Sequence, residues 1–207
     1  MLSIRFTLLV LLYLIVNFAI ETTLVSDDLV YEFLIGQLSY DRITKMLDEG
    51  KNLSWVSYFI FPLTLLLKFF LITICLSVGG LFIGLENSSK RFFSAIVNTD
   101  FVFIAPLMTK LLWFNFYQTD YSLKGLQYFS PFSALSLFNP NEVEPWLAYP
   151  LQVLNVFEFI YWLALAYQLK EVLGKSFTGS LGFVTSTYGA GLLIWVVLVM
   201  FLTVSVS

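Results

Sequence analysis

The sequence PWLAYPLQVLNVFEFIYWLALAYQ, residues 145–168, is long and apolar enough to cross a lipid bilayer. It nevertheless carries a carboxylate, Glu158, near its centre and an amide, Asn155, about one helical turn earlier. A charge at the centre of a bilayer costs about 2.5–3.5 kcal/mol on insertion scales, so Glu158 needs a partner or water. We therefore expect a membrane helix over 146–169 whose neighbours supply a partner for this carboxylate.

The composition of the whole chain indicates an all-α integral membrane protein. Of its 207 residues, 58% are hydrophobic and only 12% are charged, and the mean hydropathy is +0.84. A soluble domain of this length could not bury so much apolar surface. The net charge of −3 and the lack of a basic run argue against a nucleic-acid partner, and we expect the lipid bilayer itself to be the main one.

The same composition excludes several kinds of chemistry. The chain has no histidine, which removes His-based acid–base catalysis and His metal sites, and its single cysteine, Cys75, cannot form a disulfide framework. No phosphate loop or dinucleotide fingerprint is present. We expect no catalytic residues, no metal site and no cofactor.

Further apolar runs predict membrane helices over 4–24, 55–85, 92–117 and 182–204, which gives a single membrane domain, 1–207, with five transmembrane helices. A cleaved signal peptide is the alternative for the first run. No Ala-x-Ala-like site follows it, so an uncleaved helix is favoured. The second run exceeds the ~20 residues that a bilayer needs, so we expect it to tilt, to protrude or to kink at Pro62.

Short amphipathic helices are expected in the two long loops between these runs. In 26–54, apolar residues recur at helical spacing, which predicts two short helices, the second with Ser39 as N-cap and Gly50 as its stop. A solvated loop with incidental apolar residues is the alternative. In the other loop, Ser130-Pro131 predicts a short helix over 132–138.

Two starts are open for the helix that follows the second loop. Asn141 and Glu144 have the spacing of a capping box, whereas Pro145 favours a start at that proline, because proline prefers the first helical position.

The short loops carry basic residues that predict the orientation. With the N-terminus in the cytoplasm, five spans place Lys90, Arg91, Lys170, Lys175 and Arg5 inside, against four basic residues in the long outer loops. Short loops count most in the positive-inside rule. We therefore expect a protein of the inner (cytoplasmic) membrane with its C-terminus outside.

Polar residues inside the expected spans form the candidate site: Lys68, Asp100, Lys110, Asn155 and Glu158. Counted from the outer face, Lys68 and Glu158 lie at nearly equal depth, which predicts an ion pair between them with Asn155 as a hydrogen-bond neighbour. A pair between Lys68 and Asp100 is the alternative. The set would form either a polar pathway or substrate pocket, or buried ion pairs that only fix helix register.

The order of these features resembles the bacterial branch of the Yip-domain membrane proteins over roughly 55–204. The resemblance is carried by the residues 62–68 ending in Lys68, by Phe101-Val102-Phe103-Ile104 after Asp100, by residues 111–114, and by residues 149–158 ending in Glu158. It implies a five-span protein with a cytosolic N-terminus and a C-terminus on the opposite side. Eukaryotic members bind Rab GTPases, but their Asp-Leu-Tyr-Gly-Pro motif is absent here, so that role is not implied.

Three classes of function are compatible with the sequence. We expect first a non-enzymatic subunit or scaffold of a larger cell-envelope complex, with one or more protein partners in the membrane. The second is a small transporter or permease-like unit that uses an intramembrane site at Lys68 and Glu158. The third is a membrane enzyme or an orphan fold, and the enzyme is the least favoured class because no nucleophile stands out.

Overall fold

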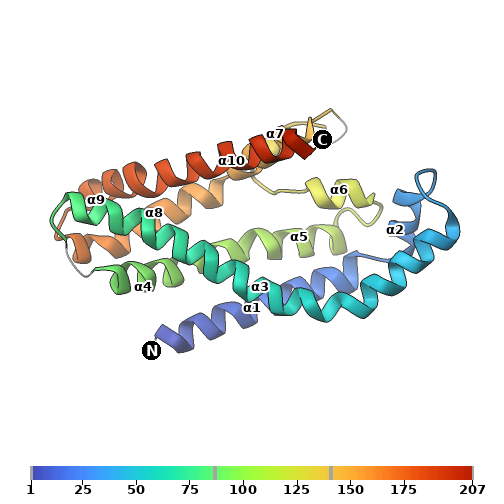
Figure 1. Ribbon diagram of the computed structural model, residues 1–207, viewed down its shortest axis with the longest axis horizontal. Helices are drawn as coiled ribbons and strands as arrows, with labels where there is room; N and C mark the ends of the chain where they lie inside the picture. The colour runs from blue at the N-terminus through green and yellow to red at the C-terminus, as the bar shows by residue number, and fades with distance from the viewer. Residues whose placement is uncertain (1, 86–87, 140–141, 207) are drawn as a thin grey trace.

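The computed structural model describes residues 2–85, 88–139 and 142–206, and within these ranges the chain is helical, with isolated bridges in place of strands (Figure 1). The all-α prediction is therefore confirmed. In chain order the α-helices are α1 (Leu2–Leu24), α2 (Asp27–Leu34), α3 (Tyr40–Phe82), α4 (Ser89–Thr99), α5 (Ile104–Phe116), α6 (Leu123–Tyr128), α7 (Pro145–Val153), α8 (Val156–Leu173), α9 (Phe177–Val184) and α10 (Ala190–Val206). Two 3₁₀ turns, Asp100–Phe103 and Ala134–Leu137, and one π-helical turn, Thr185–Gly189, complete the described elements.

Four helical stretches in the described ranges are long and apolar enough to cross a membrane: Leu2–Leu24, Trp55–Phe82, Ser89–Phe116 and Phe177–Ser205. They correspond to four of the five predicted spans. Two of them are not continuous α-helices, because a 3₁₀ turn joins α4 to α5 and a π-helical turn joins α9 to α10.

The remaining predicted span, 146–169, is not one continuous helix, so the prediction of a single helix there is wrong. The chain breaks into α7 and α8 at Leu154 and Asn155, where Asn155 is extended (φ −137°, ψ 159°). The Asn155 side chain explains the break, since an amide oxygen that caps a backbone N–H competes with continuation of the helix. In the sequence this residue looked like a neighbour of Glu158 inside a helix, whereas it is the N-cap of α8.

The first long loop is largely helical, as predicted, but its second helix does not stop at Gly50. Ser26 caps α2 by accepting from the Leu29 N–H at 3.3 Å, and Ser39 is the N-cap of α3. From there α3 continues for 43 residues through the predicted second span. A glycine inside a helix costs only about 1 kcal/mol, which the long apolar helix beyond it outweighs.

The second long loop forms less helix than the predicted one over 132–138. Its 3₁₀ turn covers only Ala134–Leu137, and a short helix that was not expected, α6, precedes it. The fourth apolar segment starts at Pro145, with Glu144 as N-cap. The alternative start at Asn141 lies outside the described residues.

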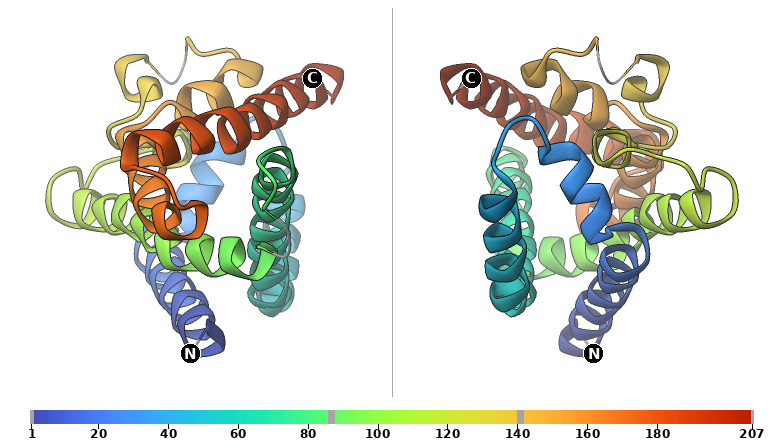
Figure 2. Two further views of the ribbon diagram at one scale, coloured as in Figure 1. Left: turned by 90° about the vertical axis from the view of Figure 1, so that its left-hand side faces the viewer. Right: turned by 90° about the vertical axis from the view of Figure 1, so that its right-hand side faces the viewer.

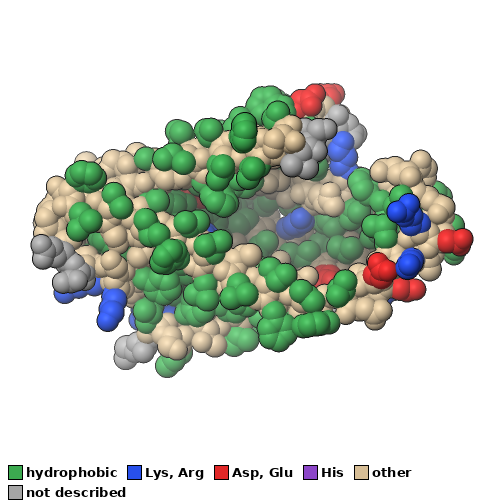
Figure 3. Space-filling model, in the orientation of Figure 1, with side chains coloured by type: hydrophobic (Ala, Val, Ile, Leu, Met, Phe, Trp, Pro, Cys, Tyr) green, Lys and Arg blue, Asp and Glu red, His purple; other side chains and the backbone are tan. Residues whose placement is uncertain are grey.

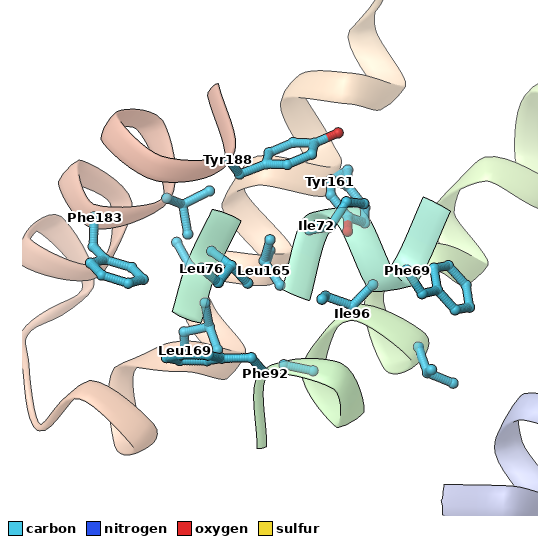
Figure 4. Close-up of a cluster of buried hydrophobic side chains, with 14 of the residues drawn as sticks. Phe69, Ile72, Leu76, Phe92, Ile96, Tyr161, Leu165, Leu169, Phe183 and Tyr188 are labelled. Atoms are coloured by element: carbon cyan, nitrogen blue, oxygen red, sulfur yellow. The ribbon is translucent and has the colours of Figure 1, made fainter. Parts of the chain in front are cut away.

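The helices pack lengthwise into one elongated bundle (Figures 1 and 2). The end of α3, the start of α4 and the junction of α8 with α9 lie together at one end of the bundle, and the C-terminus lies towards the other end (Figure 1). In the core, side chains from α3, α4, α8 and the α9 region meet in one cluster (Figure 4). The cluster includes Phe69, Leu76, Phe92, Ile96, Tyr161, Leu165, Leu169 and Phe183.

Candidate functional site

Lys68 and Asp100 form the ion pair of the bundle interior. The Lys68 ammonium lies 2.5 Å from Asp100 Oδ1, and the Tyr13 hydroxyl donates to Asp100 Oδ2 at 2.9 Å. Asp100 is fully buried, whereas the Lys68 side chain keeps 38% of its surface exposed. The Lys68 Nζ also lies 4.3 Å from the centre of the Phe103 ring, within cation–π range. Three segments of the chain are thus tied together at Asp100.

Asp100 reaches this position because the helix changes its winding there. Asp100–Phe103 is a 3₁₀ turn between α4 and α5. Pro106 has no N–H for the carbonyl of Val102, and its ring crowds that carbonyl, so a regular α-helical turn is disfavoured just before it. The turn brings both Asp100 and Phe103 next to Lys68 on α3.

Glu158 lies in the first turn of α8, near the helix N-terminus. The Asn155 Oδ1 accepts from the Glu158 N–H at 2.8 Å, and the helix dipole favours a negative side chain at this end. Its carboxylate oxygen Oε1 accepts two hydrogen bonds, from Trp162 Nε1 at 2.8 Å and from the Tyr188 hydroxyl at 2.6 Å. The other oxygen, Oε2, accepts none from the described residues, and Glu158 as a residue is only partly buried.

Tyr188 reaches Glu158 from the π-helical turn between α9 and α10. Single π-helical turns inside helices re-aim side chains and are frequent at functional sites. The close approach requires a glycine: a Cβ built on Gly189 would lie 2.8 Å from the Trp162 ring. The turn therefore places Tyr188 and Trp162 around one carboxylate.

The predicted pair between Lys68 and Glu158 is wrong, and the alternative pair with Asp100 is the one that forms. Lys68 and Glu158 were expected to pair because they lie at similar depth, but depth did not determine the partner of Lys68. The 3₁₀ turn places Asp100 next to Lys68, and Glu158 instead accepts hydrogen bonds from Tyr188 and Trp162. Lys110, on α5, has no ion-pair partner among the described residues and does not line the cavity described below. Of the predicted site residues, Lys68 and Glu158 share that cavity.

A cavity of about 700 Å³ lies inside the bundle and is bounded by α3, α7, α8 and α10. Its walls are mostly aliphatic and aromatic, and Lys68 and Glu158 are the charged residues among them. Figure 3 shows this face of the molecule hollowed between α3 and α10. Since Lys68 lies midway along Trp55–Phe82, the cavity lies beside the middle of that helical stretch.

One end of the cavity is closed by a tight contact between α3 and α10. A Cβ on Gly191 would lie 2.5 Å from the Cys75 sulfur, and Gly79 likewise leaves no room for a Cβ beside Thr187. Towards the other end the two helices separate (Figures 1 and 2). There Trp195 Nε1 on α10 donates to the Tyr149 hydroxyl on α7 at 2.8 Å. The opening between α3 and α10 is lateral, so in a bilayer it faces the lipid.

Sequence reasoning missed the aromatic part of the site: Tyr13, Tyr149, Trp162, Tyr188 and Trp195. Aromatic residues near the ends of membrane helices are usually explained by the membrane–water interface, so the sequence offered no reason to assign Tyr149 to the site. One signal was readable: Trp162 follows Glu158 by four residues, the spacing at which two helical side chains meet. Tyr188 and Trp195 gave no such signal, because their contacts depend on the packing of α10.

Compared with known proteins, the chain matches no protein-family model, no curated protein and no solved structure. The resemblance to the Yip-domain proteins therefore stays a prediction, and inferences about function rest on the site itself.

Proposed function

We propose that this protein is a small multi-pass membrane transporter or permease-like unit that binds an amphipathic organic molecule in its intramembrane cavity. The observation that carries the proposal is the cavity of about 700 Å³, which lies within the usual range of about 300–1,000 Å³ for small-molecule sites. Apolar walls with a few convergent polar groups are typical of such sites. The lateral opening gives a lipid-dissolved molecule a route of entry.

A membrane topology with five crossings supports this use. We propose that α7 and α8 together form the fourth crossing, broken at Asn155, with the N-terminus in the cytoplasm of an inner-membrane protein and the C-terminus outside. Broken helices in membrane proteins occur where the freed backbone lines a cavity. Here Val153, just before the break, and Glu158, just after it, both line the cavity.

Small molecules retained by the purified protein test the proposal. The protein is purified from native membranes, extracted, and its bound molecules are identified by mass spectrometry. Val153→Trp should fill the cavity and abolish retention, whereas Val197→Trp, an exposed position on α10 outside the cavity lining, should not. The molecule identified should then cross proteoliposome membranes with wild type and not with Val153→Trp. Equal retention by all three proteins would overturn the proposal.

A role as the subunit of a larger membrane complex is the second candidate, favoured by the exposure of α10. In the most apolar window of Phe177–Ser205 only 6% of residues are buried, against 33% for Ser89–Phe116. Either lipid or a partner helix covers this surface. A photo-crosslinking residue at Val197 in native membranes should give one discrete larger product if a protein partner is present. Crosslinking at Val184, which is fully buried, provides the background.

A further inference from the structure

The charges around the cavity do not balance. Lys68 is neutralised by Asp100 at 2.5 Å, and Asp100 cannot swing away because it is fully buried and also bound by Tyr13. Glu158 forms no ion pair within the described residues. Lys68 and Asp100 cancel each other, so an ionised Glu158 gives this cluster a net negative charge.

The geometry of Glu158 leaves one carboxylate oxygen available for a ligand. Both hydrogen bonds from Trp162 and Tyr188 end on Oε1, and Oε2 accepts none from the described residues. Glu158 is only partly buried, and it lines the cavity. An ionised carboxylate in an apolar site is stable only when it is paired or solvated. When Glu158 is ionised, Oε2 therefore needs a cation or water from outside the fold.

The cavity walls add a second preference for positive charge. Four aromatic residues line the cavity: Phe103, Tyr149, Tyr188 and Trp195. Ring faces attract cations, and tryptophan and tyrosine are the strongest of the common side chains, especially where water is excluded. The Lys68 Nζ already lies 4.3 Å from the centre of the Phe103 ring. Tyr149 on α7 and Trp195 on α10 therefore remain available to a ligand.

Resting on the proposed function, we propose that the ligand class is the lipophilic organic cation, a molecule with one positive charge set among apolar groups. Its charge would pair with Oε2 of Glu158, and its apolar groups would contact the walls formed by α3 and α10. An anionic amphiphile would meet the uncompensated carboxylate instead, and an uncharged one would leave Oε2 unpaired.

Cys75 provides a readout in the unaltered protein. It is the only cysteine in the chain, it is partly exposed, and it lines the cavity. In lipid nanodiscs, alkylation of Cys75 by N-ethylmaleimide is timed by mass spectrometry with three probes at matched membrane concentrations. The probes are tetraphenylphosphonium (cation), tetraphenylborate (an anion of the same shape) and triphenylphosphine oxide (uncharged).

Tetraphenylphosphonium should slow the alkylation at least fivefold, and the anion and the uncharged probe should have little effect. Equal protection by the anion or by the uncharged probe would overturn the cation inference while leaving the cavity as a binding site. Protection by none of the three would count against the proposed function as well. These outcomes separate the two proposals without any variant.

Variants then assign the binding to Glu158. Binding of radiolabelled tetraphenylphosphonium should weaken at least tenfold in Glu158→Gln and recover in part in Glu158→Asp. Glu171→Gln is the matched control, since it removes a carboxylate from the exposed end of the same helix. Unchanged binding in a folded Glu158→Gln would overturn the assignment. If that variant does not fold, Trp195→Leu takes its place, and weaker binding is again the expected result.

Discussion

Asp100 is the residue at which the bundle concentrates its polar contacts. Its two oxygens accept from Lys68 on α3 and Tyr13 on α1, while its backbone lies at the junction of α4 and α5. Removing one member of a buried pair leaves the other charge uncompensated, which is more damaging than removing both. The pair therefore has a testable energetic signature.

Asp100→Asn should destabilise the protein by about 3–5 kcal/mol if the value for buried pairs in soluble proteins applies, and by less if polar contacts in this bundle are weaker. Thermal unfolding in detergent measures the loss. The double variant with Lys68→Met should recover part of it, because no unpaired charge is left.

The surface pair between Lys51 and Asp27 is the control for that experiment. Both side chains are more than half exposed, at 62% and 56%. Exposed ion pairs contribute little to stability because water and salt screen them, so Asp27→Asn should have almost no effect. Equal losses in Asp27→Asn and Asp100→Asn would contradict the central role of Asp100.

Among the elements, the contact between α3 and α10 depends on Gly191. A Cβ there would lie 2.5 Å from the Cys75 sulfur. Gly191→Ala should therefore cost about 1–3 kcal/mol through overpacking, measured by thermal unfolding. Cys75→Ala should suppress much of this loss in the double variant.

Gly182 on α9 has open space where its Cβ would be, so Gly182→Ala serves as the matched control and should be neutral or slightly stabilising. A loss in Gly182→Ala as large as that in Gly191→Ala would show that helix crowding at Cys75 is not the cause.

The start of α8 makes a further prediction at the scale of the element. Asn155→Ala removes the side chain that caps the Glu158 N–H at 2.8 Å, and should cost about 0.5–2 kcal/mol. Asn155→Ser keeps a capping oxygen and should retain most of the stability. Asn115→Ala, which removes an exposed amide bound only within its own helix, should be close to neutral. Indistinguishable Ala and Ser variants at position 155 would contradict the capping role.

Elements with a strong apolar pattern could be predicted from the sequence, and junctions could not. The runs that became α1, α3 and α10 are visible because their residues are apolar over many helical turns. The break at Asn155 was missed, since an amide in an apolar run indicates a helix interior or an N-cap equally well. Likewise Lys68, Asp100 and Glu158 were recognisable as charges in apolar segments, but the choice of partner depended on the 3₁₀ and π-helical turns.

For the whole molecule, the proposed topology predicts the side on which each end of the bundle lies. A reporter inserted at Lys175, or at Asn87 in the other short loop, should read cytoplasmic, and reporters inserted at Asn139 and fused after Ser207 should read non-cytoplasmic. The reason is the basic character of the short loops at one end of the bundle. Equal readings at Asn139 and Lys175 would show that α7 and α8 do not cross the membrane together, and swapped readings at Asn87 and Ser207 would reverse the orientation.

In the proposed membrane topology, the ion pair at Asp100 also constrains how the protein is made. Lys68 is synthesised 32 residues before Asp100, and Tyr13 precedes Asp100 by 87. During translation the ammonium of α3 therefore meets the insertion machinery before its counter-charge exists. A lone lysine at mid-depth opposes release into lipid. We expect α3 to wait at the translocon until α4 and α5 have emerged, so that the three helices enter the bilayer as one neutral unit.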